Sequence, residues 1–271
     1  MAKRILVAVV CIPLIFVVIY LLPPIFLPVA ISVLTMIALH EVLWSTGFVK
    51  NAKVSALSIA LSGLVPFWVY IGEGMHSALA GIFVYFVLMF AIAISSHYTV
   101  TLEKMGGSFF FAMLIPYFLS SFVRLHELEL GEYLVLLPLV AAFASDAFAL
   151  FAGMAFGRHK LAPALSPKKT VEGAVGGLLG AVVCTVLYGA GLRLLFHYQV
   201  DYVRLALYGG LGSVVSQLGD LSFSSIKREY GIKDFGNILP GHGGILDRFD
   251  SVIFCAPLIE LLIRTLPAIG R

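Results

Sequence analysis

The chain has 271 residues, of which 60% are apolar and only 12% are charged, and its formal net charge at neutral pH is +3. A soluble domain carries about 25% charged residues, so this composition excludes an ordinary water-soluble protein and predicts an integral membrane protein. The small net charge says little by itself, and we expect no nucleic-acid partner.

The fold class predicted from the hydropathy pattern is all-α, a polytopic integral membrane protein with about nine transmembrane helices. A helix needs about 17–25 mostly apolar residues to cross a bilayer. The opening stretch MAKRILVAVVCIPLIFVVIYLL has an apolar run longer than the core of about 7–15 residues in a signal peptide, so we interpret it as the first span. The nine predicted spans lie near residues 4–22, 25–44, 54–71, 78–97, 107–124, 133–157, 171–195, 202–219 and 249–267.

The distribution of basic residues predicts the orientation of these spans. A cytoplasmic N-terminus places most of the 18 lysine and arginine residues on the cytoplasmic side, as the positive-inside rule requires. We predict that residues 1–130 form N-terminal transmembrane helices that serve as a scaffold for lipid access or dimer contacts. Residues 131–271 are predicted to form the catalytic region, with a cytoplasmic motif loop at 220–250.

The stretch that follows the eighth span is rich in charged residues. Asp220 stands where lipid gives way to water, and Lys227 and Arg228 follow it. A carboxylate at that depth is costly unless it is paired or bound to a metal, so it is a candidate functional group.

A glycine-rich turn, Gly241–Gly244, precedes two aspartates that are three residues apart, Asp247 and Asp250. Glycine lets the backbone approach a ligand closely. If a helix begins near Ile245, the two carboxylates share a face at its N-terminal end, where anions are also favoured. Carboxylates beside lysine and arginine suit a magnesium–nucleotide complex. The alternative is an ordinary cytoplasmic loop whose acidic and basic residues pair with one another.

Polar residues also occur at three other places along the chain. The stretch SPKKTVEG contains Lys168 and Lys169 before the seventh span, and its Thr and Glu resemble a helix cap. These lysines either bind phosphate or only mark the topology. Asp146 lies inside the sixth span, where we expect it to line a polar cavity. For His40 and Glu41, in the second span, a structural contact and a place in the site are equally supported.

The stretch SSIKREYGIKDFGNILPGHGGILDRFDS resembles the defining motif of the phosphatidate cytidylyltransferases, also called CDP-diacylglycerol synthases. The motif positions fall without a gap on the residues of this chain. SPKKTVEG and Asp146 followed by Gly157–Arg158 are also similar to that family. The resemblance is strong over residues 140–270. The matching motif positions are Ser224, Lys227, Arg228, Lys233, Asp234, Pro240, His242, Gly243, Gly244, Asp247, Arg248 and Asp250.

This resemblance implies transfer of a cytidylyl group from CTP to phosphatidic acid, with Mg²⁺ and a possible second cation, in a homodimer. Asp220, Asp247 and Asp250 are the expected metal ligands. The expected catalytic residues are Asp220, Asp247, Asp250, His242, Lys227 and Arg228. The expected substrate-binding residues are Lys168, Lys169, Ser224, Lys233, Asp234, Gly243, Gly244, Arg248 and Asp146.

Two rival functions fit parts of the sequence. A transporter or channel would spread its charged residues along several spans, whereas here they cluster at one edge. A CTP-dependent lipid kinase would release CDP in place of pyrophosphate. The DGxxAR-type motif of the CDP-alcohol phosphotransferases is absent from the sequence. By family likeness we expect a bacterial inner membrane protein whose active site faces the cytoplasm.

Overall fold

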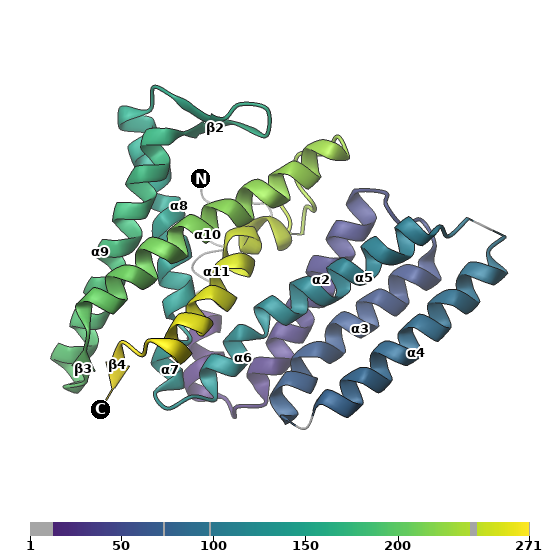
Figure 1. Ribbon diagram of the computed structural model, residues 1–271, viewed down its shortest axis with the longest axis horizontal. Helices are drawn as coiled ribbons and strands as arrows, with labels where there is room; N and C mark the ends of the chain where they lie inside the picture. The colour runs from purple at the N-terminus through teal and green to yellow at the C-terminus, as the bar shows by residue number, and fades with distance from the viewer. Residues whose placement is uncertain (1–12, 73, 98, 239–242, 271) are drawn as a thin grey trace. The chain divides into compact units, whose positions relative to one another are not determined.

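The computed structural model describes residues 13–72, 74–97, 99–238 and 243–270 (Figure 1). By its internal contacts the chain divides into two compact units. The first unit contains the residues up to Arg124 together with Glu229–Phe249. The second contains Leu125–Arg228 and Asp250–Arg271. We predicted a single division near residue 130. The structure groups the segment Glu229–Phe249 with the N-terminal helices, and the division into a scaffold and a catalytic region stays a prediction.

The first unit is a bundle of long helices in which α3 contacts α2, α4 and α5. Asn51 caps α3, because its side-chain oxygen accepts the backbone N–H groups of Lys53 and Val54. Between α2 and α3, the Ser32 hydroxyl donates to the Gly63 carbonyl at 2.5 Å. The elements are η1 (Val17–Leu21), α2 (Phe26–Ser45), α3 (Ala52–Ile71), α4 (Gly74–Ser95) and α5 (Leu102–Leu119), and α6 (Ser121–His126) crosses the boundary between the units.

The second unit is built around the long helices α8, α9, α10 and α11, with two short β-ribbons (Figure 1). The ribbons pair β1 with β2 and β3 with β4, both antiparallel. The described helices and strands are α7 (Gly131–Leu134), α8 (Leu137–Phe156), β1 (Lys160–Ala162), β2 (Ser166–Thr170), α9 (Val171–Phe196), β3 (Gln199–Val200), α10 (Tyr202–Glu229), α11 (Leu246–Thr265) and β4 (Ile269–Gly270).

Glycines set the close packing of α8 against α9. A Cβ atom on Gly177 would lie 2.7 Å from the Ser145 carbonyl oxygen, and one on Gly173 would lie 2.8 Å from the Ala149 carbonyl oxygen. These distances are shorter than van der Waals contact, so only glycine allows the two backbones to approach this closely. Gly173 and Gly177 therefore serve the packing of α9 against α8.

Six helical segments among the described residues are long and apolar enough to cross a membrane. The all-α, polytopic class is confirmed, while the count of nine spans and the orientation of the N-terminus stay predictions. Residues 4–12 of the first predicted span, 4–22, lie outside the described residues, and η1 lies within the rest of it. The six segments are Phe26–Ser45, Ala52–Ile71, Ser77–Ser95, Leu102–His126, Gly131–Phe156 and Val171–Phe196.

The helix that contains the eighth predicted span is longer than we predicted. We expected it to end near residue 219 and a loop to occupy 220–250, but α10 continues to Glu229 and α11 begins at Leu246. Asp220, Ser224, Lys227 and Arg228 therefore lie on a helix. Their spacing of four, seven and eight residues places them on one face of α10.

Candidate active site

The polar face of α10 carries the first part of the candidate site, within the second unit. Asp220 begins this face, and its Oδ1 accepts a hydrogen bond from the Ser224 hydroxyl at 3.2 Å. Gly219, the preceding residue, allows α11 to approach, because a Cβ atom there would lie 2.8 Å from the Asp250 carbonyl oxygen. A single glycine thus brings the backbone of α11 close to the start of the polar face.

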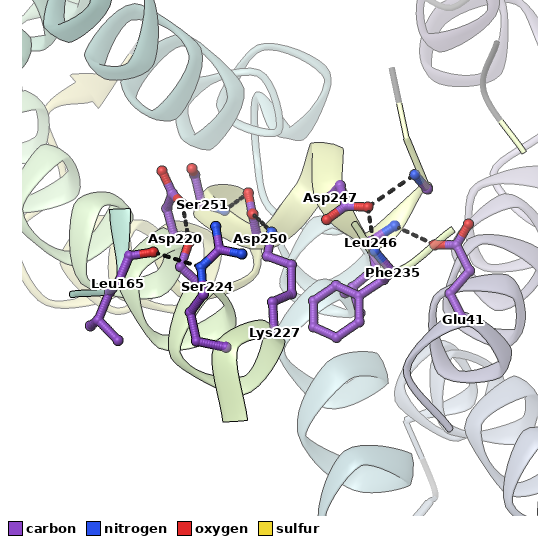
Figure 2. A network of polar contacts seen from close by, with 12 residues as sticks. Glu41, Leu165, Asp220, Ser224, Lys227, Phe235, Leu246, Asp247, Asp250 and Ser251 are labelled. Atoms are coloured by element: carbon purple, nitrogen blue, oxygen red, sulfur yellow. Dashed lines mark hydrogen bonds and ion pairs between the residues drawn. The ribbon is translucent and has the colours of Figure 1, made fainter. Parts of the chain in front are cut away.

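Asp250 and Lys227 form a buried ion pair in this unit (Figure 2). Lys227 Nζ lies 3.6 Å from Asp250 Oδ2, and the two residues are 8% and 7% exposed. The backbone N–H of Ser251 donates to Asp250 Oδ1 at 2.9 Å. The charges of Asp220 and Asp146 also act on Asp250. We call Asp146, Asp220 and Asp250 the acidic cluster.

The β1–β2 hairpin lies against the same face of α10. Lys169 Nζ forms an ion pair with Asp220 Oδ2, and Arg228 Nε donates to the Leu165 carbonyl oxygen at 3.1 Å (Figure 2). Lys168, the neighbouring predicted residue, is exposed. The hairpin therefore presents Lys169, and not Lys168, to the acidic cluster.

The start of α9 fixes the base of this hairpin. Thr170 is the N-cap, and its hydroxyl accepts the Gly173 N–H at 3.1 Å, so the predicted cap is confirmed. Glu172, in the first turn, accepts the N–H of Arg158 at 3.0 Å and contacts His159 Nδ1 at 2.6 Å. These bonds hold the end of β2 beside the end of α8.

The second part of the candidate site lies in the first unit, around Asp247. Its Oδ2 accepts the backbone N–H groups of Phe235 at 2.8 Å and Gly244 at 3.0 Å. Gly243 has a φ of +83°, a conformation that side chains rarely adopt. Asp247 is buried, and its carboxylate joins Phe235 to Gly244, two residues of the segment between α10 and α11, which we call the motif segment.

Glu41 on α2 is a buried residue that our predicted site residues do not include. Its two carboxylate oxygens accept the N–H groups of Ile245 at 3.0 Å and Leu246 at 2.8 Å. Figure 2 draws the bond to Leu246. The signal in the sequence was a glutamate inside an apolar span, which is rarely exposed to lipid. The spacing along the chain could not identify its partners, because they follow it by more than 200 residues.

The remaining predicted residues are placed as follows. Lys233, Asp234 and Arg248 are exposed residues of the first unit. His242 and Pro240 lie outside the described residues. Within the described residues of either unit, no three His, Cys, Asp or Glu side chains gather as metal ligands would. The roles assigned to the site residues, including metal binding by Asp220, Asp247 and Asp250, stay predictions.

Comparisons with known proteins cover nearly the whole sequence. The model of a family described as the cytidylyltransferase family matches residues 2–266. The chain is 35% identical to the phosphatidate cytidylyltransferase of Bacillus subtilis (strain 168) over 248 residues, which are 88% of this chain and 89% of that protein. It is 36% identical to the protein of the same name from Thermotoga maritima over 170 residues, which are 62% and 63% of the two chains. The chain is also 34% identical to the phosphatidate cytidylyltransferase of Rickettsia bellii over 180 residues, which are 65% of this chain and 78% of that protein.

Proposed function

The chain belongs to the cytidylyltransferase family, and we propose that it transfers a cytidylyl group from CTP to phosphatidic acid. The products are CDP-diacylglycerol and pyrophosphate, and the reaction is a step of phospholipid synthesis. The geometric observation that best supports this function is the pairing of Asp220 with Lys169 and of Asp250 with Lys227 in one unit. Such a set of opposite charges suits two anionic reactants and a divalent cation.

The reaction needs no side-chain nucleophile. An ionised oxygen of the phosphatidic acid phosphate attacks the α-phosphorus of CTP, and an O–P bond forms. The bond from this phosphorus to the bridging oxygen of the β-phosphate breaks, and pyrophosphate leaves with that oxygen and the electron pair. Both reactants are anions, so positioned cations must reduce their repulsion. Lys169 and Lys227 are the lysines that the geometry supports for this task.

Two members of the acidic cluster, Asp220 and Asp250, offer carboxylate oxygens of the kind that Mg²⁺ prefers. Magnesium prefers hard oxygen ligands and is usually held by one or two carboxylates together with substrate phosphates. Asp220 and Asp250 would hold it, and we include Asp247 on the basis of the sequence motif. When bound, magnesium would neutralise charge on the phosphates and orient them. Lys169 and Lys227 balance the charges of the Asp220 and Asp250 carboxylates, with which they are paired.

The membrane location follows from the apolar helices and from the bacterial relatives. We place the protein in the bacterial inner membrane as a homodimer, with the site facing the cytoplasm, where CTP is found. The basic residues of the sequence support this orientation through the positive-inside rule.

The test is a reaction of the purified full chain in detergent with cytidine-labelled CTP, phosphatidic acid and Mg²⁺. The label is expected to enter the lipid fraction as CDP-diacylglycerol, with release of one pyrophosphate per turnover. Omitting phosphatidic acid should abolish both products. Release of CDP together with a phosphorylated lipid would contradict the proposal and support the lipid-kinase alternative.

A further inference from the structure

Glu41 occupies the N-terminus of helix α11 within the first unit. The first N–H groups of a helix have no partner inside the helix, and a negative charge near them is stabilising. Glu41 Oε1 accepts the N–H of Ile245 and Oε2 accepts that of Leu246. The side chain is only 3% exposed, so these bonds form away from water, where a charged acceptor binds strongly.

Two glycines of the motif segment give Glu41 its space. A Cβ atom on Gly244 would lie 2.5 Å from Glu41 Oε2, and one on Gly236 would be in contact with Oε1 at an even shorter distance. Any larger residue at either position would displace the carboxylate. Gly244 was predicted to bind substrate. The space that the Glu41 carboxylate needs is a second constraint that only glycine meets at this position.

Asp247 completes the same arrangement. It accepts the Gly244 N–H, so two carboxylates take the N–H groups of three successive residues, 244 to 246. Asp247 also accepts the Phe235 N–H, while the Ser45 hydroxyl of α2 donates to the Phe235 carbonyl oxygen. Phe235 and residues 245–246 are thus hydrogen-bonded to the C-terminal part of α2. We also expected phosphate at this helix start, but the Ile245 and Leu246 N–H groups are bonded to Glu41.

We propose that Glu41 is a positioning residue for the cytidylyl transfer. Its carboxylate fixes the motif segment and the first turn of α11, and thereby the orientation of Asp247. The proposal rests on the proposed function. It implies that α2, through Glu41, helps to position residues of the reaction site. Glu41 does not itself contact substrate in this role.

The first experiment measures the position of the segment without using activity. Amide hydrogen exchange is followed in peptides that cover residues 243–248, in the purified full chain and in Glu41→Gln. The variant keeps the shape of the side chain but turns one acceptor oxygen into a donor. Exchange is expected to become about tenfold faster or more, because a bonded amide exchanges only on local opening. The control is Glu103→Gln, the same change at an exposed residue in the first turn of α5.

The second experiment measures turnover of CTP by the same proteins. A displacement of about 1 Å at a reacting group can cost 10²-fold, so kcat of Glu41→Gln is expected to fall about 10- to 100-fold. KM for CTP is expected to stay within about threefold, because the lost interaction acts on the transition state and not on nucleotide binding. Glu103→Gln should keep both constants.

A third measurement uses Gly236→Ala, which disturbs the same contact from the other side. Alone, it is expected to lower kcat about tenfold, as overpacking displaces the carboxylate. Combined with Glu41→Ala it should add less than about twofold, because residues in contact have non-additive effects. Additive losses would contradict a direct contact between the two residues.

The outcomes separate this proposal from the proposed function. If the unaltered protein makes no CDP-diacylglycerol, the proposed function fails, and the exchange experiment still decides whether Glu41 holds the segment. Unchanged exchange in Glu41→Gln overturns the positioning role, and so does faster exchange with an unchanged kcat. A Glu41→Gln protein that is not monodisperse also overturns it, since Glu41 would then serve folding.

Discussion

Lys227 Nζ lies 3.6 Å from Asp250 Oδ2 in an environment where both side chains are almost completely buried. The two residues come from different helices, α10 and α11, and Gly219 permits the close approach of these helices. A charge in such a place must be balanced, so the two residues stabilise each other, and we propose that both also serve the reaction.

Removing one partner of this pair is expected to destabilise the second unit. Lys227→Met leaves the Asp250 carboxylate buried without its cation, and such a loss costs about 3–5 kcal/mol. Thermal unfolding in detergent should show a clear fall in Tm. The double variant Lys227→Met/Asp250→Asn should recover part of the lost Tm but none of the turnover. A single variant as stable as the unaltered protein would contradict a buried ion pair.

Asp220→Asn is expected to lower kcat by about 10²-fold or more, because it removes a charge from the acidic cluster that would hold the cation. The matched control is Asp201→Asn, the same change at the other end of α10. Asp201 accepts the N–H groups of Val203 and Arg204, and asparagine caps a helix equally well. Equal turnover by the two variants would remove Asp220 from the site.

Magnesium removal is expected to stop the reaction, and the response should depend on Asp220. Chelation with EDTA should abolish CDP-diacylglycerol formation, and added Mg²⁺ should restore it. In Asp220→Asn, the concentration of Mg²⁺ needed for half-maximal activity should rise about tenfold or more, since loss of a carboxylate weakens binding of a hard cation. An unchanged magnesium requirement would contradict ligation by Asp220.

The two neighbouring lysines of β2 are expected to differ in effect. Lys169 is paired with Asp220, whereas Lys168 is exposed. Lys169→Gln should lower kcat/KM for CTP about tenfold or more, because a cation beside the acidic cluster is lost. Lys168→Gln should change it less than about threefold. Steady-state kinetics at varied CTP concentration checks both, and a reversed order would contradict the placement of the hairpin.

Two glycines of α9 provide a test of helix packing that is independent of activity. Gly177→Ala places a methyl group against the Ser145 carbonyl oxygen and should destabilise the protein by about 1–3 kcal/mol. Gly191→Ala has open space around it and should leave Tm unchanged or raise it, because alanine favours the helix by about 1 kcal/mol. Equal Tm values would contradict the close packing of α8 and α9.

Part of the fold could be read from the sequence because it depends on local features. The apolar runs predicted the membrane class and most of the helices, and the Thr170 cap follows from residues close together along the chain. The end of α10 was predicted wrongly because we interpreted the charged residues that begin at Asp220 as the start of a loop, whereas they continue the helix. The spacing of Asp220, Ser224, Lys227 and Arg228 already had the period of a helical face.

The sequence by itself determined that the protein is membrane-embedded and which stretch carries its polar residues, because composition and short motifs are properties of neighbouring residues. Only the tertiary structure decided that Lys169 pairs with Asp220 and that Glu41 holds the start of α11. These partners are far apart along the chain, and a contact of this kind depends on how the helices pack.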